Sequence, residues 1–343
     1  MKTQLASPYL LRIDADSRSI SFGGSQDGWF PGIIRNVKAA PFEYARPATL
    51  AEVCSLLAER GPDAKLIAGG QSLVPMMAMR LAQPAWLIDI SRLAELQGIA
   101  APAGQPAGQD GALLVGAGVR QCVMERDPLA RASVPLLARA LRWVGHAQTR
   151  NRGTIGGSIV HADVSAEIAL VACVLDATLE LRDTSNVCEV PAREFFLAPM
   201  ITSIAPDQCL TQIRFPVWRH SGGEAMRGCA FDEVSVRHGD FALVSACAQL
   251  ELDSDGRCLR AELGIGGAAP VPLALPELGA QLVGTRLDQQ AITAAADAAT
   301  DMIDPESDLH ASADYRRHLT RVLVGRVLRA AQEDAMRMTK LPT

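Results

Sequence analysis

The first clear pattern of apolar positions begins after Thr49. Apolar side chains then recur at helical spacing, which predicts a helix that is capped by Thr49 and ended by Gly61-Pro62. Apolar runs at residues 65–68 and 86–90 predict two short strands. The first of these strands leads directly into Gly69-Gly70. The segment therefore predicts a unit of strand, glycine turn, helix and strand.

A second set of apolar segments follows residues 101–112, whose low complexity is typical of a surface loop. The pattern predicts a strand at 113–115 and a helix with one apolar face from 136 to 144. An apolar run of small residues at 168–174 precedes another predicted strand at 177–182.

The last third of the chain changes character. Apolar stretches at 241–252 and 259–265 predict antiparallel strands. Helical patterns follow at 288–303 and 313–335, and the second has apolar residues on one side and arginines opposite. Together these elements predict a C-terminal α+β domain.

These changes in pattern divide the chain into three parts. We expect an N-terminal extension at 1–38, a main domain at 39–213 with subdomains at about 39–98 and 110–213, and a C-terminal domain at 214–335. The extension could be a β-hairpin, an arm on a partner subunit or a disordered segment, and its sequence leaves these alternatives and its role open.

Composition and charge narrow the classes of function. A net charge of −5, with no run of five basic residues, argues against a surface for nucleic acid or anionic membrane. No stretch approaches the roughly 20 apolar residues of a membrane-spanning helix, and the first residues lack the layout of a secretory signal. We therefore expect a cytoplasmic protein without a membrane span.

Cysteine and histidine are too dispersed to predict a metal site. The 8 cysteines never stand in CxxC or CxC spacing, and the 6 histidines never form HxH or HxxxH. Zinc and iron–sulfur sites usually pair their ligands at such short spacing. We expect free, mostly buried thiols in a reducing compartment and no metal in this chain.

Two glycine pairs are the strongest candidates for a binding site. They lie in the segments 68–73 (Ala-Gly-Gly-Gln-Ser-Leu) and 154–158 (Thr-Ile-Gly-Gly-Ser). Glycines let backbone N–H groups converge on phosphate oxygens, although a single pair after a strand is more often a tight turn. Two such loops together could cradle a pyrophosphate. Neither has the Rossmann or P-loop spacing, so a dinucleotide would use another scaffold.

Charged residues near the second pair allow two interpretations. Glu167 could accept hydrogen bonds from a ribose or an adenine amine, or it could be an acid that favours the start of a helix. Arg150 and Arg152 could face an anionic ligand, a partner subunit or solvent. The sequence contains no GxSxG, no HExxH and no other recognisable hydrolytic set, which favours cofactor chemistry.

Four segments resemble the FAD-binding, medium subunit of molybdenum hydroxylases of the carbon monoxide dehydrogenase and xanthine dehydrogenase class. They are 66–73 with its continuation to Leu81, 150–158 with its continuation to Asp163, 237–242 and 315–319, in the order found in the family. The resemblance implies an α+β fold, in which a two-subdomain FAD-binding domain of the vanillyl-alcohol-oxidase type precedes an α+β C-terminal domain.

The resemblance also implies a set of FAD contacts. Both loops would hold the pyrophosphate, an acid would lie near the ribose and adenine, and one backbone contact would reach the isoalloxazine ring. The residues at these positions are Leu66, Ile67, Ala68, Gly69, Gly70, Gln71, Ser72, Leu73, Thr154, Ile155, Gly156, Gly157, Ser158, Glu167 and Ile204.

The partners follow from the same resemblance. A large molybdopterin-binding subunit would oxidise the substrate, and a small subunit would pass electrons through two [2Fe-2S] clusters to FAD. An external acceptor would then take the electrons. A dimer of heterotrimers is implied, and no catalytic residue for substrate oxidation is expected in this chain.

Some positions depart from the family. Val164 replaces a common proline, Val236 replaces a common arginine, and Asp232 stands where some relatives carry a lysine near the flavin. A carboxylate there would change the electric field at the ring and disfavour an anionic nicotinamide cofactor. Two rival functions remain, a self-contained FAD-dependent oxidoreductase and a cofactor-free assembly factor with the same fold.

Overall fold

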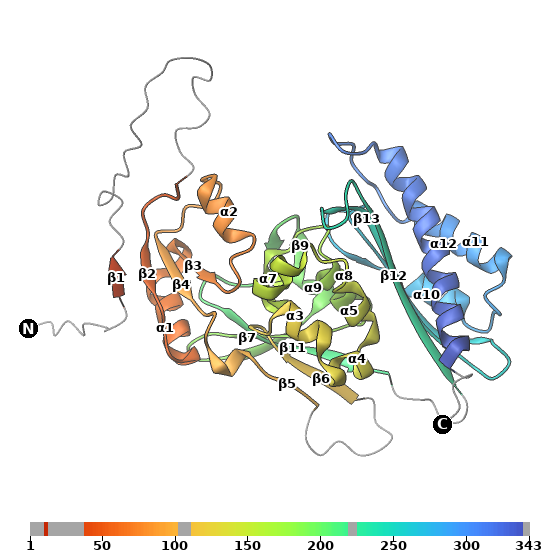
Figure 1. Ribbon diagram of the computed structural model, residues 1–343, viewed down its shortest axis with the longest axis horizontal. Coiled ribbons are helices and arrows are strands. Elements are labelled where there is room, and N and C mark those ends of the chain that lie inside the picture. The colour runs from red at the N-terminus through yellow and green to blue at the C-terminus, as the bar shows by residue number, and fades with distance from the viewer. Residues whose placement is uncertain (1–9, 13–37, 102–110, 219–224, 339–343) are drawn as a thin grey trace, which may run out of the picture.

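The computed structural model describes residues 10–12, 38–101, 111–218 and 225–338, which form three packed units (Figure 1). The first unit is a small sheet that carries the first glycine pair. Its strand order is β1-β2-β4-β3, in which β2 and β3 run parallel to β4. Its elements are β1 (Leu10–Arg12), β2 (Glu43–Ala45), α1 (Leu50–Arg60), η1 (Gly61–Asp63), β3 (Ala64–Ile67), α2 (Leu73–Ala78), β4 (Trp86–Asp89) and η2 (Ala94–Leu96).

The predicted unit of strand, glycine turn, helix and strand is confirmed in β3, α2 and β4. The predicted caps of α1 are also present. The Thr49 hydroxyl accepts a hydrogen bond from the Glu52 N–H at 3.2 Å, and Gly61 ends the helix with a φ of 56°. Of the N-terminal extension, only β1 and residue 38 are described. β1 pairs antiparallel with β2, and the rest of the extension lies outside the described residues.

The second unit is an antiparallel five-stranded sheet with the order β5-β6-β11-β7-β8. Its strands are β5 (Ile99–Ala100), β6 (Gly111–Gly116), β7 (Thr178–Arg182), β8 (Val187–Pro191) and β11 (Cys209–Val217). The remaining elements are α3 (Gln121–Arg126), α4 (Pro128–Ser133), α5 (Pro135–Ala140), α6 (Ala147–Arg152), α7 (Ile155–His161), α8 (Glu167–Val174), α9 (Ala192–Phe195), and the hairpin of β9 (Phe196–Ala198) and β10 (Ile201–Thr202).

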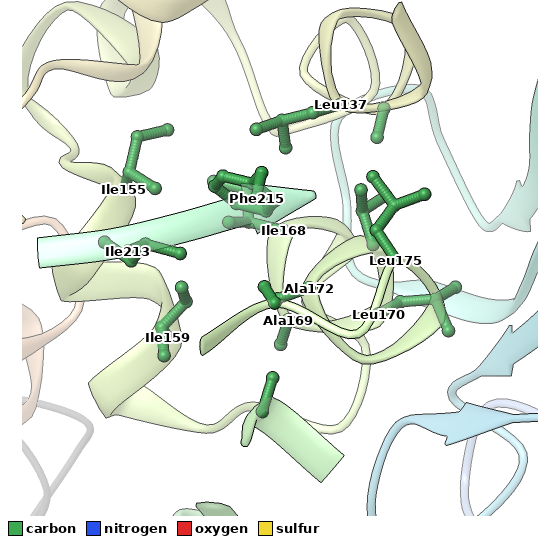
Figure 2. Close-up of a cluster of buried hydrophobic side chains, with 14 of the residues drawn as sticks. Leu137, Ile155, Ile159, Ile168, Ala169, Leu170, Ala172, Leu175, Ile213 and Phe215 are labelled. Atoms are coloured by element: carbon green, nitrogen blue, oxygen red, sulfur yellow. The ribbon is translucent and has the colours of Figure 1, made fainter. Parts of the chain in front are cut away.

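Helix α8 lies at the centre of the largest hydrophobic core. Every residue from Ile168 to Val174 is buried, because α5, α7 and the sheet surround this helix. Figure 2 shows Ile168 of α8 next to Phe215 of β11, and Leu137 of α5 belongs to the same core. The run of small apolar residues in the sequence is therefore the signature of a helix that is buried on all sides.

Two predictions for this unit were wrong. The helix predicted to 144 ends at Ala140, and the following residues form turns whose apolar side chains Leu141 and Val144 are still buried. The apolar pattern therefore marked buried residues correctly but did not mark where the helix ends. The second glycine pair lies not in a loop but in the first turn of α7.

The third unit is an antiparallel sheet with the order β12-β13-β14-β15, as the apolar stretches predicted. Helices α10 and α12 pack on one face, and α11 packs on these two helices, while α5 and α8 pack on the other face (Figure 1). Strand β13 is consequently buried along its whole length. The elements are β12 (Met226–Ser235), β13 (Ala242–Leu252), β14 (Cys258–Gly266), β15 (Leu273–Ala274), α10 (Pro276–Leu282), α11 (Gln289–Asp301) and α12 (Ala313–Met338).

The boundary between the main and C-terminal domains is set by β11. This strand pairs with β6 up to Val217, so a boundary at residue 214 would divide it. We therefore propose a boundary near residue 218, which keeps the five-stranded sheet intact.

Close contact between β12 and α12 yields a prediction for stability. A Cβ atom added at Gly228 would clash with the Ala331 carbonyl oxygen and lie 3.0 Å from the Ala335 Cα. Gly228→Ala should therefore lower the free energy of unfolding by about 3 kcal/mol, since backbone atoms must separate. Urea unfolding followed by circular dichroism measures this loss.

The matched control is Gly98→Ala. No atom lies within 4 Å of the position where its Cβ would stand. Equal losses in the two variants would contradict the close packing of α12 on β12.

Candidate functional site

A cleft of about 1490 Å³ lies where the three units meet. Its walls come from the turn after β3, from α7 and the start of α8, and from the loops at one end of the C-terminal sheet. Pockets for small molecules usually measure roughly 300–1,000 Å³. The cleft is therefore large enough for an extended dinucleotide.

The first glycine turn is held tightly against the second unit. A Cβ atom at Gly69 would clash with the Arg152 carbonyl oxygen and lie 2.8 Å from the Gly153 Cα. Gly70 adopts a φ of 71°, a conformation that side chains disfavour. Both glycines are therefore required by geometry, the first by close approach and the second by its backbone angle.

Four consecutive N–H groups line the cleft at this turn. They belong to Gly69, Gly70, Gln71 and Ser72, and no acceptor for any of them is found among the described residues. Buried or partly buried backbone donors are normally hydrogen-bonded. Successive unfilled N–H groups form a concavity that favours an anion such as a phosphate.

The N–H groups of the second glycine pair already have acceptors within the protein. The N–H groups of Ile155 and Gly156 donate to the carbonyl oxygens of Val119 and Ala117, both at 2.9 Å. The N–H group of Gly157 donates to the Thr154 hydroxyl at 3.0 Å, which caps α7. These donors are already used, so this segment does not offer them to a pyrophosphate. Its glycines instead allow α7 to approach the neighbouring backbone closely.

Fourteen of the fifteen predicted contact residues line the cleft, and Ile155 does not. The Ile155 side chain is fully buried in the core below α7. Ile204 lines the cleft and packs on the edge of the same core. The two sequence segments and Glu167 are thus brought together as the resemblance implied.

Glu167 is the first residue of α8 and faces the cleft. Burial, together with the nearby charge of Asp163, raises the pKa of its carboxyl to about 7. The backbone N–H of Glu167 and the charge of Arg150 oppose this increase. The residue therefore begins a helix and also lines the cleft, and its contact with the cofactor stays a prediction.

The side chain of Arg150 is bonded to other residues of this chain. Its guanidinium pairs with Glu125 at 2.9 Å and donates to the carbonyl oxygens of Val144 and Gly145. Arg152 contributes a backbone carbonyl that accepts from Arg120 and packs on Gly69. The side chain of Arg150 is thus occupied by fold-stabilising contacts.

The hypothesis that Asp232 acts on the flavin ring was wrong. Asp232 lies on β12, and its carboxylate is 3.6 Å from the guanidinium of Arg326 on α12. It is absent from the residues that line the cleft. Alternation along the strand turns Asp232 towards the covering helix and the next residue, Glu233, towards the other face.

Sequence reasoning missed the contribution of the C-terminal domain. The buried side chain of Arg316 donates to the carbonyl oxygens of Leu243 and Gly267 and pairs with Asp308 at 2.7 Å. These bonds tie the segment 304–310 to the ends of β13 and β14, where it lines the cleft. The only sequence signal was that Arg316 lies in the fourth resembling segment.

Gln121 was also missed. It borders the cleft but is only 5% exposed, and its Oε1 atom is buried next to Gly153 without a hydrogen-bond partner among the described residues. A buried acceptor of this kind usually has a partner. Nothing in the local sequence distinguished this residue.

The described residues contain no group of three or more His, Cys, Asp or Glu placed to hold a metal. Six of the eight cysteines are buried, as expected, while Cys122 is partly exposed and Cys188 is exposed. None of the helices in the described part of the chain is long and apolar enough to cross a membrane.

The family described as the FAD binding domain in molybdopterin dehydrogenase matches residues 40–218. The CO dehydrogenase flavoprotein C-terminal domain matches residues 229–331. This chain belongs to the family of FAD-binding subunits of molybdenum hydroxylases. The predicted family, α+β fold class and cofactor are confirmed, and the chain is a subunit of an oxidoreductase.

Relatives of known activity cover nearly the whole chain. The 6-hydroxypseudooxynicotine dehydrogenase complex subunit alpha of Paenarthrobacter nicotinovorans is 35% identical over 86% of this chain and 96% of its own. The carbon monoxide dehydrogenase medium chain of Hydrogenophaga pseudoflava is 33% identical over 84% and 96%. Quinoline 2-oxidoreductase from Pseudomonas putida 86 superimposes with a TM-score of 0.79 and 36% identity, over 87% of this chain and 99% of its own.

The cleft fits FAD on its own geometry. The unfilled N–H groups at 69–72 suit the pyrophosphate, and the Glu167 carboxyl suits hydroxyl or amine donors of the ligand. The cleft also extends from the first unit to the C-terminal loops, as a dinucleotide requires.

Substitution of Gly69 tests the contact between the two glycine segments. Gly69→Ala should push the turn away from Arg152 and Gly153 and disturb the four donors, which should raise the FAD dissociation constant by roughly tenfold or more. Titration of the apo-protein by flavin fluorescence measures this constant. Gly98→Ala, on open surface, should bind FAD normally, and equal affinity in both variants would contradict the assignment.

The raised pKa of Glu167 predicts a pH dependence of stability. The folded carboxyl keeps its proton up to about pH 7, whereas the unfolded one loses it near its ordinary pKa of 4.5. The apo-protein should therefore lose about 2 kcal/mol of unfolding free energy through this group as the pH rises across that window.

Glu167→Gln should lack that loss. Urea unfolding of the apo-protein at about pH 5 and about pH 8 gives the difference between wild type and variant at each pH. The same pH dependence in both proteins would show that Glu167 does not titrate in a buried site.

Proposed function

We propose that this chain is the flavin electron-transfer subunit of a molybdenum hydroxylase complex. It would take electrons from a partner subunit with two [2Fe-2S] clusters and release them to an external acceptor. The observation that carries the proposal is the row of four unfilled N–H groups in a cleft that Glu167 also lines. Relatives that are medium chains or subunits of complexes support the multi-subunit setting.

The residues of this chain would bind and enclose the cofactor. The turn at 69–72 would hold the pyrophosphate, Glu167 would accept hydrogen bonds from the ribose or adenine, and the backbone at Ile204 would approach the ring. The bonds of Arg316 to the Gly267 carbonyl oxygen and to Asp308 would keep segment 304–310 at the wall of the cleft. Bound FAD supplies the redox chemistry, because it can exchange electrons singly or in pairs.

Exposed apolar side chains on both rims of the cleft suit a partner subunit. Val74, Met79 and Leu81 lie at or after α2 and are 50–71% exposed. Leu197, Met200 and Ile201 lie on or between β9 and β10 and are 49–61% exposed. Met200 lines the cleft, and the others lie close in sequence to residues that do, such as Met76 and Ala82. We propose that the [2Fe-2S] subunit docks here, since apolar side chains become buried at stable interfaces.

The wider assembly follows the same proposal. A large molybdopterin-binding subunit would complete a heterotrimer, which would dimerise, in the cytoplasm. The free thiols of this chain suit a reducing compartment. No catalytic residue for substrate oxidation is proposed here, so the substrate would be selected by the large subunit.

The visible absorption spectrum of the purified chain tests the core of the proposal. We expect flavin bands and the release of one FAD per chain on denaturation. After rapid mixing with the chemically reduced [2Fe-2S] subunit, the flavin bands should bleach. A colourless protein would favour the cofactor-free assembly factor, and substrate oxidation by the isolated chain would favour the self-contained oxidoreductase.

A charge introduced at Leu81, on the rim of the cleft, tests the proposed contact with the [2Fe-2S] subunit. Leu81→Glu should weaken binding of the [2Fe-2S] subunit by roughly tenfold or more, because a carboxylate would be desolvated at the interface. FAD content should stay at the wild-type level. Leu259→Glu is the control, since Leu259 is 44% exposed on β14 and does not line the cleft. Equal effects of both variants on binding, measured by calorimetry, would contradict docking at this rim.

A further inference from the structure

Phe241 is an exposed aromatic residue on the wall of the cleft. It is 74% exposed, and in the part of the chain that the structure describes no other phenylalanine is exposed. It lines the cleft together with its neighbours Asp240 and Ala242. A single exposed apolar side chain is ordinary on open surface. The surroundings of Phe241 therefore decide what its exposure implies.

The loop that precedes Phe241 is fixed by its own bonds and by a neighbouring segment. The Asp240 N–H donates to the Arg237 carbonyl oxygen at 3.0 Å, and the two side chains form an ion pair at 3.1 Å. Gly239 has a φ of 89°, and a Cβ atom there would clash with the ring of His146. The backbone therefore reaches Phe241 in a defined conformation.

The residue that follows Phe241 is bonded to the segment that carries Glu167. The Ser165 hydroxyl donates to the Ala242 carbonyl oxygen at 2.9 Å. Ser165 and Glu167 both line the cleft. The backbone of Phe241 is thus held on both sides next to the chain that connects α7 to α8, while its side chain stays exposed at the cleft.

Helix α7 separates this place from the glycine turn. The turn packs on Gly153, directly before α7, whereas Ser165 follows the end of the helix. Helix α7 has 7 residues, and a helix of that length spans about 10 Å. A dinucleotide carries one planar ring on each side of its pyrophosphate. With the pyrophosphate at the turn, a ring placed along α7 therefore reaches the wall that bears Phe241.

The loop between β9 and β10 indicates which of the two rings lies at this end. The Met200 N–H donates to the carbonyl oxygen of Ala162, the residue after α7, at 2.9 Å. Met200 therefore belongs to the same end of the cleft, and it is also part of the rim proposed for the [2Fe-2S] subunit. Electron transfer is faster over shorter distances, which favours the redox-active ring at this end.

We propose that Phe241 is a cofactor-contact residue that packs against the isoalloxazine ring of FAD. The inference rests on the proposed function, in which FAD occupies the cleft. Aromatic rings attract each other in offset-stacked or edge-to-face arrangements, in addition to the apolar surface that they bury. The contact would explain why an aromatic side chain stays exposed on a wall whose backbone is fixed.

The test compares two ligands that share the adenosine and pyrophosphate, of which only FAD carries the isoalloxazine ring. Phe241→Ala should raise the FAD dissociation constant of the apo-protein by roughly tenfold, because the ring loses its aromatic partner. It should leave the dissociation constant of ADP unchanged. Phe241→Tyr should bind both ligands as wild type does. Calorimetry measures both constants, and flavin fluorescence checks the value for FAD.

Phe241→Trp gives an independent answer, even where ADP binds too weakly to compare. An indole in contact with the isoalloxazine ring quenches flavin fluorescence by electron transfer. We therefore expect FAD to bind this variant as tightly as wild type, with several-fold lower fluorescence per bound flavin. Unchanged fluorescence would mean that the side chain at 241 does not reach the ring and would overturn the proposal.

Leu309→Ala is the matched control. Leu309 is fully exposed in the segment 304–310 of the same domain and does not line the cleft, so this variant should bind FAD and ADP normally. Unchanged FAD affinity in Phe241→Ala would overturn the proposal, as would an equal loss of affinity for FAD and ADP. Weaker binding of the [2Fe-2S] subunit alone would assign Phe241 to the interface and also overturn it. Failure of the wild-type apo-protein to bind FAD would instead refute the proposed function.

Discussion

The contact of Gly69 with the backbone of Arg152 and Gly153 joins the first two units of this protein. Because no side chain intervenes, the turn after β3 lies directly on the segment that leads into α7. The four unfilled N–H groups of the turn are thereby held at the wall of the cleft rather than on open surface. The proposed binding of phosphate by this turn depends on the close approach. A displaced turn would point its N–H groups away from the ligand and would change the shape of the cleft.

The C-terminal domain completes the site from the other side. Its sheet is covered by α10 and α12 on one face and by α5 and α8 on the other, so the start of α8 lies between the cleft and the sheet. Arg316 fixes one loop of this domain at the cleft. The domain therefore contributes both a wall of the cleft and the surface on which α8 packs.

Sequence patterns predicted much of the backbone correctly. The capped helix α1, the unit of β3, α2 and β4, and the antiparallel C-terminal strands all follow local rules of capping and periodicity. The errors have a common cause. Apolar residues after Ala140 stay buried although the helix has ended, because neighbouring elements cover them. Gly156 lies in a helix rather than a loop, and its N–H group already donates to the Ala117 carbonyl oxygen of a neighbouring segment. Local sequence carries no record of those neighbours.

The sequence by itself determined the family and the cofactor, through four segments that resemble one known family in its order, and it also identified the segments that line the cleft. Only the tertiary structure decided which members of those segments face the cleft. It buried Ile155 and turned Asp232 towards Arg326. The surroundings of a side chain on a strand depend on the register of that strand and on the helices that cover each face of the sheet. Contacts between distant parts of the chain set both.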